Sequence, residues 1–254
     1  MEKKAIINQK GGTGKTTTVV NLGHALARRG IKTLLIDVDS QGNVLNWFNV
    51  EYDNSIYELL MEGKKPKECI VNVRENLDVL PSDRRTAKAE NHVNTEVSRE
   101  TVLKRRLSSL EENDEYDIVL LDCPPGITLL NKNALVYADG IYLPVSTDYM
   151  ALVGVGKVMD NVDEINEVFD DDLEIELVIP TFFDVRTSIS KEVLDKLEDF
   201  FGDKVTEPIR INVRLKEAPS HSETIFEYAS KSHGAEDYDK LAKIVEKKRS
   251  SKVI

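Results

Sequence analysis

The segment Lys10–Thr17, which reads Lys-Gly-Gly-Thr-Gly-Lys-Thr-Thr, constrains this chain more than any other part of it. It follows the apolar run Ala5–Ile7 and precedes Thr16–Arg29, where apolar residues recur at helical spacing. The glycines let successive backbone N–H groups turn toward phosphate oxygens, and a helix N-terminus adds the positive end of its dipole. The sequence therefore predicts a phosphate-binding loop between the first strand and the first helix.

The loop assigns a role to each polar residue. We expect Lys15 to neutralise the β- and γ-phosphates of a nucleotide, the Thr16 hydroxyl to ligate Mg²⁺, and Thr17 to reach the α-phosphate. Lys10 stands where the common G-x-x-x-x-G-K-[ST] pattern has its first glycine. A second lysine beside one triphosphate has a function if Lys10 reaches the nucleotide that is bound to a second copy of the chain. The alternative is that Lys10 is an ordinary solvated lysine at the side of the loop. The full set expected around the nucleotide phosphates is Gly11, Gly12, Thr13, Gly14, Lys15, Thr16 and Thr17.

Three aspartates follow apolar runs typical of buried strands. Asp37 and Asp39 come after Thr33–Ile36, and Asp122 comes after Ile118–Leu121. Open α/β sheets bind ligands at the carboxyl ends of their strands, and residues i and i+2 of a strand point to the same side. We expect Asp39 to orient the attacking water, with Asp37 and Asp122 holding the metal ion through water. A helix cap or a solvated turn is the alternative for the first pair.

Strand-like and helix-like segments alternate along the chain, with no internal repeat and no Pro/Gly/Ser-rich linker. This alternation predicts an α/β fold with a doubly wound, mostly parallel sheet of the P-loop NTPase type, flanked by helices, in one domain over 1–254. The expected strands contain 5–7, 33–36, 77–80, 118–121, 141–143 and 176–179, and the expected helices contain 16–29, 101–111, 130–138, 155–169 and 190–201.

The composition of the chain further restricts how it could contact DNA or a membrane. With 34 Lys and Arg against 45 Asp and Glu, the formal charge is −11, so any contact with DNA must be made by a local group of basic residues. The longest apolar runs have five residues, far short of the roughly 20 that span a bilayer, and the apolar N-terminal stretch is too short for a signal peptide. We therefore expect a cytoplasmic protein whose Cys69 and Cys123 are reduced packing residues.

Taken together, these motifs resemble the ParA/Soj/MinD family of deviant Walker ATPases, and most closely the small ParA proteins of the Soj type. The resemblance implies an ATPase that uses ATP, ADP and Mg²⁺, with Lys10 acting across a sandwich homodimer and Asp39 as the hydrolytic aspartate. It further implies sequence-independent binding of double-stranded DNA, released when a ParB-like centromere-binding or adaptor protein stimulates hydrolysis. Plasmid or chromosome partition on the nucleoid is the function it implies. The matching segments include 10–17, 37–43, 121–125, 183–187 and 212–220.

The resemblance also assigns residues outside the phosphate loop. Arg186 and Arg214 align with arginines that the family uses to bind DNA, although an ordinary surface salt bridge is the alternative for both. Asn212 and Thr181 are expected near the adenine. The segment Ile209–Arg214 reads Ile-Arg-Ile-Asn-Val-Arg where such proteins commonly have Ile-Pro-Arg-Asn-Val-Arg. One arginine has thus moved, and the proline is missing.

Three other functions compete with DNA partition. The first is positioning of a protein cargo on the nucleoid, which differs only in the adaptor. The second is a MinD-like membrane-cycling regulator of division-site placement, which needs a lipid-binding C-terminal helix. The tail 240–254 has six basic residues but no Trp or Phe, and four apolar residues have the spacing of a core-facing helix: Leu241, Ala242, Ile244 and Val245. The third is a metabolic enzyme such as an ATP-dependent amidoligase, which would normally need a further domain.

Overall fold

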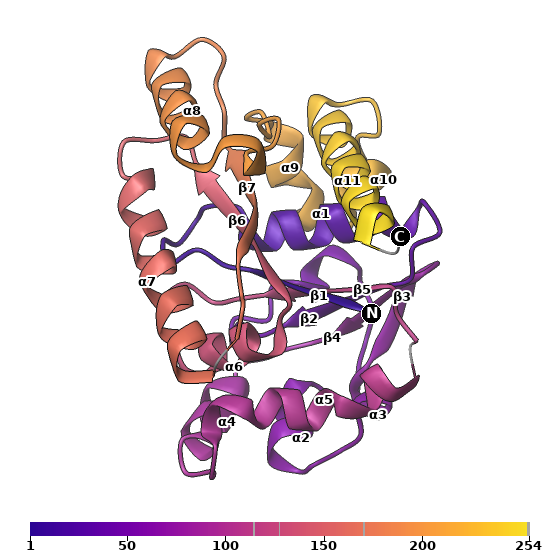
Figure 1. Cartoon of the computed structure of the whole chain (residues 1–254). Helices are drawn as coiled ribbons and strands as arrows, with labels where there is room; N and C mark the ends of the chain where they lie inside the picture. Colours follow the sequence, from indigo (N-terminus) through magenta and orange to yellow (C-terminus); the bar gives the residue numbers. More distant parts are fainter. Residues whose placement is uncertain (114, 127, 170, 253–254) are drawn as a thin grey trace.

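A seven-stranded sheet runs through the centre of the computed structural model, which describes residues 1–113, 115–126, 128–169 and 171–252 (Figure 1). The strand order is β3-β4-β2-β5-β1-β6-β7. Every neighbouring pair is parallel except β3 and β4, which are antiparallel. The strands are β1 (Glu2–Ile6), β2 (Thr33–Asp37), β3 (Val71–Arg74), β4 (Leu77–Leu80), β5 (Ile118–Asp122), β6 (Gly140–Ser146) and β7 (Ile175–Thr181).

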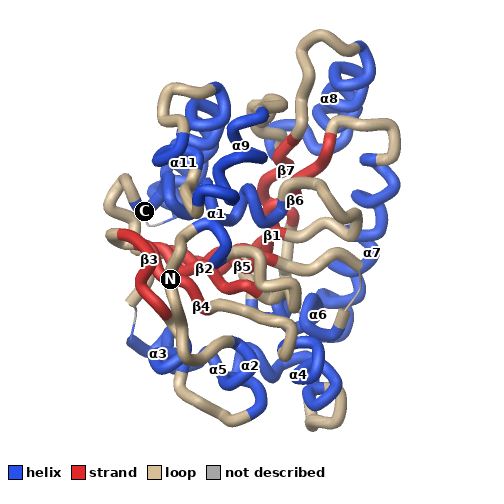
Figure 2. The backbone as a smooth tube through the Cα atoms, turned by 180° about the vertical axis from the view of Figure 1, so that it is seen from behind, coloured by secondary structure: helices blue, strands red, loops and turns tan. Residues whose placement is uncertain are grey.

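Helices cover both faces of this sheet (Figures 1 and 2). Alternate residues of β2 show why, because Leu34 and Ile36 pack into one apolar core while Leu35 packs into the other. The first core lies under α2 (Ile56–Met61), α3 (Pro66–Cys69), α4 (Thr86–Val93), α5 (Val102–Asn113), α6 (Leu129–Tyr137), α7 (Ala151–Phe169) and α8 (Ser188–Phe201). The second lies under α1 (Lys15–Ala27), α9 (Val213–Glu217), α10 (Ile225–Tyr228) and α11 (His233–Lys252).

The predicted fold class is confirmed, and each expected strand and helix is present with shifted ends. The largest shift is at α7, which begins four residues before Val155. The sequence prediction missed β3, a four-residue edge strand that pairs antiparallel with β4 through a turn at Asn76. Only Val73 of its four residues is buried, and the strand includes the polar residues Asn72 and Arg74, so no apolar run marks it. The interpretation of 1–254 as a single domain stays a prediction.

The C-terminal helix α11 packs along α1. Tyr238 is buried, and its hydroxyl lies 3.2 Å from the Thr18 hydroxyl of α1. The expected core face of this helix is confirmed, with Leu241, Ala242 and Val245 buried and Ile244 packed beside them, while residues 253–254 lie outside the described part. No helix among the described residues is long and apolar enough to cross a membrane.

The register of three central strands places the functional residues at one edge of the sheet. Ile6 of β1 and Asp37 of β2 both pair with Asp122 of β5. Because these strands are parallel, the loops that follow them leave the sheet side by side. The loop after β1 leads into α1 through Gly14, whose φ of 87° favours glycine. The sheet therefore brings residues from three separate segments to one place.

The turn after β2 depends on close packing of Gly42 against the loop after β4. Gly42 has a φ of +63°, and a Cβ there would lie 2.5 Å from the Ser82 carbonyl oxygen. Gly30 also has a positive φ, +78°, but a Cβ there would meet nothing within 4 Å. Substitution of Gly30 therefore measures the cost of the backbone conformation alone, without a steric clash. We expect Gly30→Ala to lower the free energy of unfolding by about 1 kcal/mol and Gly42→Ala by about 2 to 4 kcal/mol. Urea unfolding followed by circular dichroism measures both, and equal losses would contradict the packing argument.

Candidate nucleotide site

The loop between β1 and α1 forms an open cradle of backbone groups. Gly12 and Gly14 take positive φ angles of 73° and 87°. Gly11 and Gly12 are exposed, and a Cβ placed on either would meet nothing within 4 Å. Side chains on these residues would fill the space above the backbone. The loop therefore keeps its N–H groups accessible to a ligand, as the phosphate-loop prediction requires.

Lys15 lies buried beneath this cradle. Its Nζ donates hydrogen bonds to the carbonyl oxygens of Asn8 and Lys10, at 3.0 and 3.2 Å. Burial lowers the pKa of Lys15, and the nearby Asp122 counteracts this. The ammonium is thus held by neutral carbonyl groups of the loop itself. An anionic phosphate in the cradle would supply the counter-charge that these carbonyls do not.

Asn8 anchors the loop, and sequence reasoning missed it. Its side-chain amide donates to the Pro144 carbonyl oxygen in β6 at 2.7 Å, and its Oδ1 accepts from the Lys10 backbone N–H at 3.0 Å. Gly154 of α7 allows this close packing, because a Cβ there would lie 2.8 Å from Asn8 Oδ1. The signal in the sequence was a polar residue directly after the short apolar run Ala5–Ile7.

Thr16 and Asp122 meet at the start of α1. The Thr16 hydroxyl donates to Asp122 Oδ2 at 2.6 Å, while Asp122 Oδ1 is buried and has no hydrogen-bond partner among the described residues. Burial, together with the nearby Asp39, raises the pKa of Asp122 to about 7, although the hydrogen bond from Thr16 acts in the opposite direction. An unpartnered buried carboxylate oxygen beside a hydroxyl fits a hydrated Mg²⁺. No group of three or more His, Cys, Asp or Glu side chains in the described ranges could hold a metal ion.

Asp37 and Asp39, predicted as a pair, have different surroundings. Asp37 is buried and accepts hydrogen bonds from the backbone N–H groups of Asp39 and Val44, at 3.0 and 3.1 Å. Burial and the neighbouring Asp122 raise its pKa well above the usual carboxyl range. Asp39 is half-exposed, with one oxygen accepting from the Gln41 N–H at 2.9 Å. Asp37 therefore organises the turn, and Asp39 is the accessible carboxylate.

Lys10 lies beside the cradle and pairs within its own chain. Its Nζ is 2.7 Å from both carboxylate oxygens of Asp148 and 3.4 Å from the Ser146 hydroxyl. These residues line a cavity of about 410 Å³ that also includes Gly12 and Lys216. The side chain is about one-third exposed, so it is accessible from outside.

Thr181 and Asn212 lie on the other side of the loop. Thr181 donates to the Thr13 carbonyl oxygen at 2.9 Å, and Asn212 caps α9 by accepting from the Arg214 N–H at 2.9 Å. Both line a cavity of about 290 Å³ that also borders Gly14 and Thr17. The sequence did not indicate its large apolar walls, which include Trp47, Phe182, Ile209 and Leu215.

The two arginines expected at DNA pair with neighbouring carboxylates. Arg186 contacts both oxygens of Asp184 at 2.9 and 2.7 Å, and Arg214 donates to Glu217 at 2.9 Å. Their side chains remain 80% and 58% exposed. Arg210, which stands where the family pattern has proline, instead pairs with the buried Asp237. The salt-bridge alternative is thus observed in the single chain, but both candidate guanidinium groups stay at the surface.

A glycine-rich cradle, a buried lysine and carboxylates at the ends of adjacent parallel strands define a P-loop nucleotide-binding protein. A family model described as "AAA domain" matches residues 1–175. The sporulation initiation inhibitor protein Soj of Bacillus subtilis is 41% identical over 246 residues, covering 95% of this chain and 96% of that protein. The chromosome partitioning protein ParA of Caulobacter vibrioides is 36% identical, covering 95% and 92%. The chain belongs to the ParA/Soj/MinD family of deviant Walker ATPases and is an ATPase.

Solved structures agree on the fold. A cobyrinic acid a,c-diamide synthase from Mycobacterium smegmatis, with a bound ATP analogue and magnesium, superposes with a TM-score of 0.81 at 29% identity, covering 96% of this chain and 93% of that one. An ATP complex of a McdA variant from Cyanothece has a TM-score of 0.85 at 22% identity, covering 97% and 95%. The synthase chain matches this one over nearly the whole length of both. The length of the chain therefore does not distinguish such a synthase from a partition ATPase. The higher identity to the chromosome partitioning protein ParA favours the latter.

Substitution of Thr16 tests the magnesium corner. We expect Thr16→Ala to weaken nucleotide binding about 10-fold when Mg²⁺ is present and to change it little when Mg²⁺ is chelated, because the hydroxyl acts on the metal. Thr17→Ala is the matched control, with equal losses expected in both conditions because that hydroxyl is predicted to contact a phosphate rather than the metal. Titration with a fluorescent ATP analogue measures both. A Mg²⁺-independent loss in the Thr16 variant would contradict the assignment.

Proposed function

We propose that this protein is a DNA-partition switch in which ATP joins two copies and hydrolysis separates them. The observation that carries the proposal is the second loop lysine, Lys10, at the rim of the cradle in a chain whose near-full-length relatives are named for chromosome partitioning. These names also favour DNA over a protein cargo. The apolar residues of the C-terminal helix pack in the core and are therefore not free to bind lipid. This packing disfavours the MinD-like membrane-cycling function.

Features of the loop support the proposed dimer. Gly11 and Gly12 present no side chains, so a second copy can approach the nucleotide closely. Tyr149 and Met150, just beyond Asp148 at the end of β6, are 83% and 54% exposed. Large exposed apolar residues beside a polar site are typical of a contact surface. In this arrangement Lys10 would leave Asp148 and contact the phosphates of the other copy.

In this proposal, different residues of the site carry out different parts of ATP hydrolysis. Lys15 and the loop N–H groups hold the phosphates, and Thr16 and Asp122 would hold Mg²⁺, which supplies charge neutralisation when bound. Asp39, the accessible carboxylate, orients the attacking water. Lys10 of the other copy stabilises the charge that develops during transfer, so hydrolysis requires the dimer. A ParB-like partner would accelerate this step and so release DNA and return the protein to its free state.

Removal of the Lys10 ammonium tests the dimer. Lys10→Ala should retain ATP binding but lose the ATP-dependent dimer and hydrolysis. Lys132→Ala is a matched control, because Lys132 also forms an intrachain ion pair, with Glu164 at 2.6 Å, but on α6. Light scattering with ATP or ADP measures the dimer, and phosphate release measures turnover. Normal turnover by the Lys10 variant would rule out action across an interface.

DNA binding is proposed for the dimer, through Arg186 and Arg214. Each guanidinium would exchange its intrachain carboxylate for a DNA phosphate, and dimerisation doubles the number of such contacts. Since phosphates carry no base information, binding should be indifferent to sequence. This contact with chromosomal DNA would place the protein on the nucleoid.

Charge reversal tests these contacts. Arg186→Glu or Arg214→Glu should weaken DNA binding while ATP-dependent dimerisation persists. If each arginine neutralises one phosphate in each copy, the slope of log affinity against log salt should fall in magnitude by about 1.8. Arg105→Glu, at an exposed arginine of α5 paired with Glu96, is the control. Electrophoretic shifts on random-sequence duplexes across a salt series give the slope, and equal effects of all three changes would remove the assignment.

A further inference from the structure

Two residues line both of the cavities beside the phosphate loop. The cavity of about 410 Å³ adjoins the loop at Gly12, and the cavity of about 290 Å³ adjoins it at Gly14 and Thr17. Their linings have only Phe182 and Lys216 in common. Lys216 is an exposed residue of α9. Its side chain therefore lies where the two cavities meet, next to the path of a nucleotide held by the loop.

The other basic residues that line these two cavities already have carboxylate partners. Lys10 pairs with Asp148, and Arg210 pairs with Asp237. Lys216 forms no ion pair with any residue that the structure describes. No carboxylate is among the described residues that line the cavity of about 290 Å³. The Lys216 ammonium is thus an uncompensated positive charge in both linings, and it favours an anionic ligand.

The packing of α9 explains why the neighbouring carboxylate does not compensate Lys216. Leu215 packs against the second apolar core and fixes the orientation of this short helix. Glu217 is the only acidic residue of α9. Its Oε2 accepts hydrogen bonds from Arg214 at 2.9 Å and from the Tyr228 hydroxyl at 3.1 Å. The acidic group next to Lys216 in the sequence is therefore already engaged by other donors.

Phe182, the other shared residue, has a strained backbone. Its φ of +53° lies in the left-handed region, which is uncommon for a bulky side chain. Its carbonyl oxygen accepts a hydrogen bond from the Thr147 hydroxyl at 3.2 Å, and its ring would lie 3.7 Å from a Cβ placed on Gly14. Such strain is found mostly at functional sites. A nucleotide that extends from the loop toward the cavity of about 290 Å³ would pass between this ring and Lys216.

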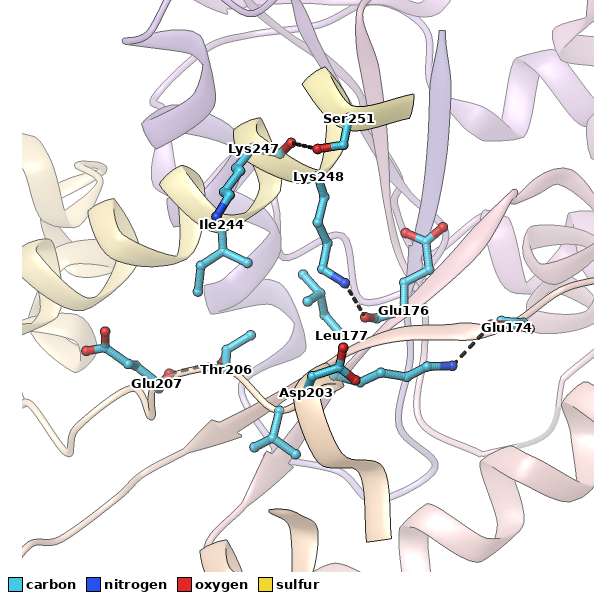
Figure 3. A pocket seen from close by; sticks show the side chains of 12 residues that line it. Glu174, Glu176, Leu177, Asp203, Thr206, Glu207, Ile244, Lys247, Lys248 and Ser251 are labelled. Atoms are coloured by element: carbon cyan, nitrogen blue, oxygen red, sulfur yellow. Dashed lines mark hydrogen bonds and ion pairs between the residues drawn. The ribbon is translucent and has the colours of Figure 1, made fainter. Parts of the chain in front are cut away.

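A cavity of about 800 Å³ between α11 and β7 provides a contrast (Figure 3). Four acidic residues and three lysines line it. Lys204 pairs with Glu174 at 3.1 Å, and Lys248 donates to the Glu176 carbonyl oxygen at 3.4 Å. Because charges of both signs are mixed and partly paired in this lining, it does not select an anion as the lining around Lys216 does.

We propose that Lys216 binds the α- and β-phosphates of the nucleotide held by its own chain. These phosphates are the ones expected between Gly12 and Thr17, the loop residues that the two cavities adjoin. ATP and ADP share them, so a charge-assisted hydrogen bond from Lys216 would stabilise both nucleotides. Lys10, by contrast, is expected to act on the ATP of a second copy. This inference rests on the placement of the phosphates in the proposed function and adds a residue of α9 to that site.

Nucleotide titrations of the full chain test the proposal. Lys216→Met removes the charge but keeps a side chain of similar length, whereas Lys216→Arg keeps the charge. In isothermal titration calorimetry with Mg²⁺, we expect Lys216→Met to bind ADP and ATP each about 10-fold more weakly and Lys216→Arg to stay within about 3-fold of the unchanged protein. The loss in the Met variant should shrink at high ionic strength, because the contact is electrostatic.

Lys88→Met is the matched control. Lys88 is exposed on α4, which covers the opposite face of the sheet from α9, and it lines neither cavity. Unchanged ADP affinity in Lys216→Met, or equal losses in both Met variants, would overturn the proposal. Unchanged ADP affinity with weaker DNA binding would also overturn it and would assign Lys216 to the surface that carries Arg214. ATP-dependent dimerisation retained in a variant with unchanged ADP affinity would reject the role of Lys216 and leave the proposed switch intact.

Discussion

The parallel pairing of β1, β5 and β2 is the constraint on which the rest of the structure depends. Ile6, Asp122 and Asp37 end their strands in register, so the phosphate loop and both buried carboxylates emerge at one edge. Buried strands fix this register, because a one-residue slip would turn β2 side chains toward the wrong core. The geometry of the site is therefore maintained by apolar packing on both faces of the sheet.

Within that frame, the site contains buried charges that are only partly compensated. Lys15 contacts carbonyl groups, and one oxygen of Asp122 has no hydrogen-bond partner in the part of the chain that the structure describes. Uncompensated buried charges disfavour the folded state, and a bound phosphate and metal ion would relieve this cost. The same arrangement therefore links ligand binding to the stability of the loop. Lys10, partly exposed and paired with Asp148, is the charge best placed to respond to another molecule.

Electrostatics also divides the outer surface. The edge formed by α7, β7 and α8 carries nearly all the net charge, while the remainder of the chain is close to neutral. A nearly neutral remainder allows an exposed arginine such as Arg214 to approach a polyanion, which a uniform charge of −11 would oppose.

The sequence by itself determined the fold class, the phosphate loop and the aspartates at strand ends, because these depend on local patterns of apolar, glycine and charged residues. It did not reveal β3, of whose four residues only Val73 is buried, or the anchoring role of Asn8, which depends on contacts with β6 and α7. Only the tertiary structure decided that Asp37 is buried and Asp39 accessible, and that Arg210 pairs with Asp237. Those outcomes depend on which distant residues pack against each side chain, and neither local spacing nor composition specifies that.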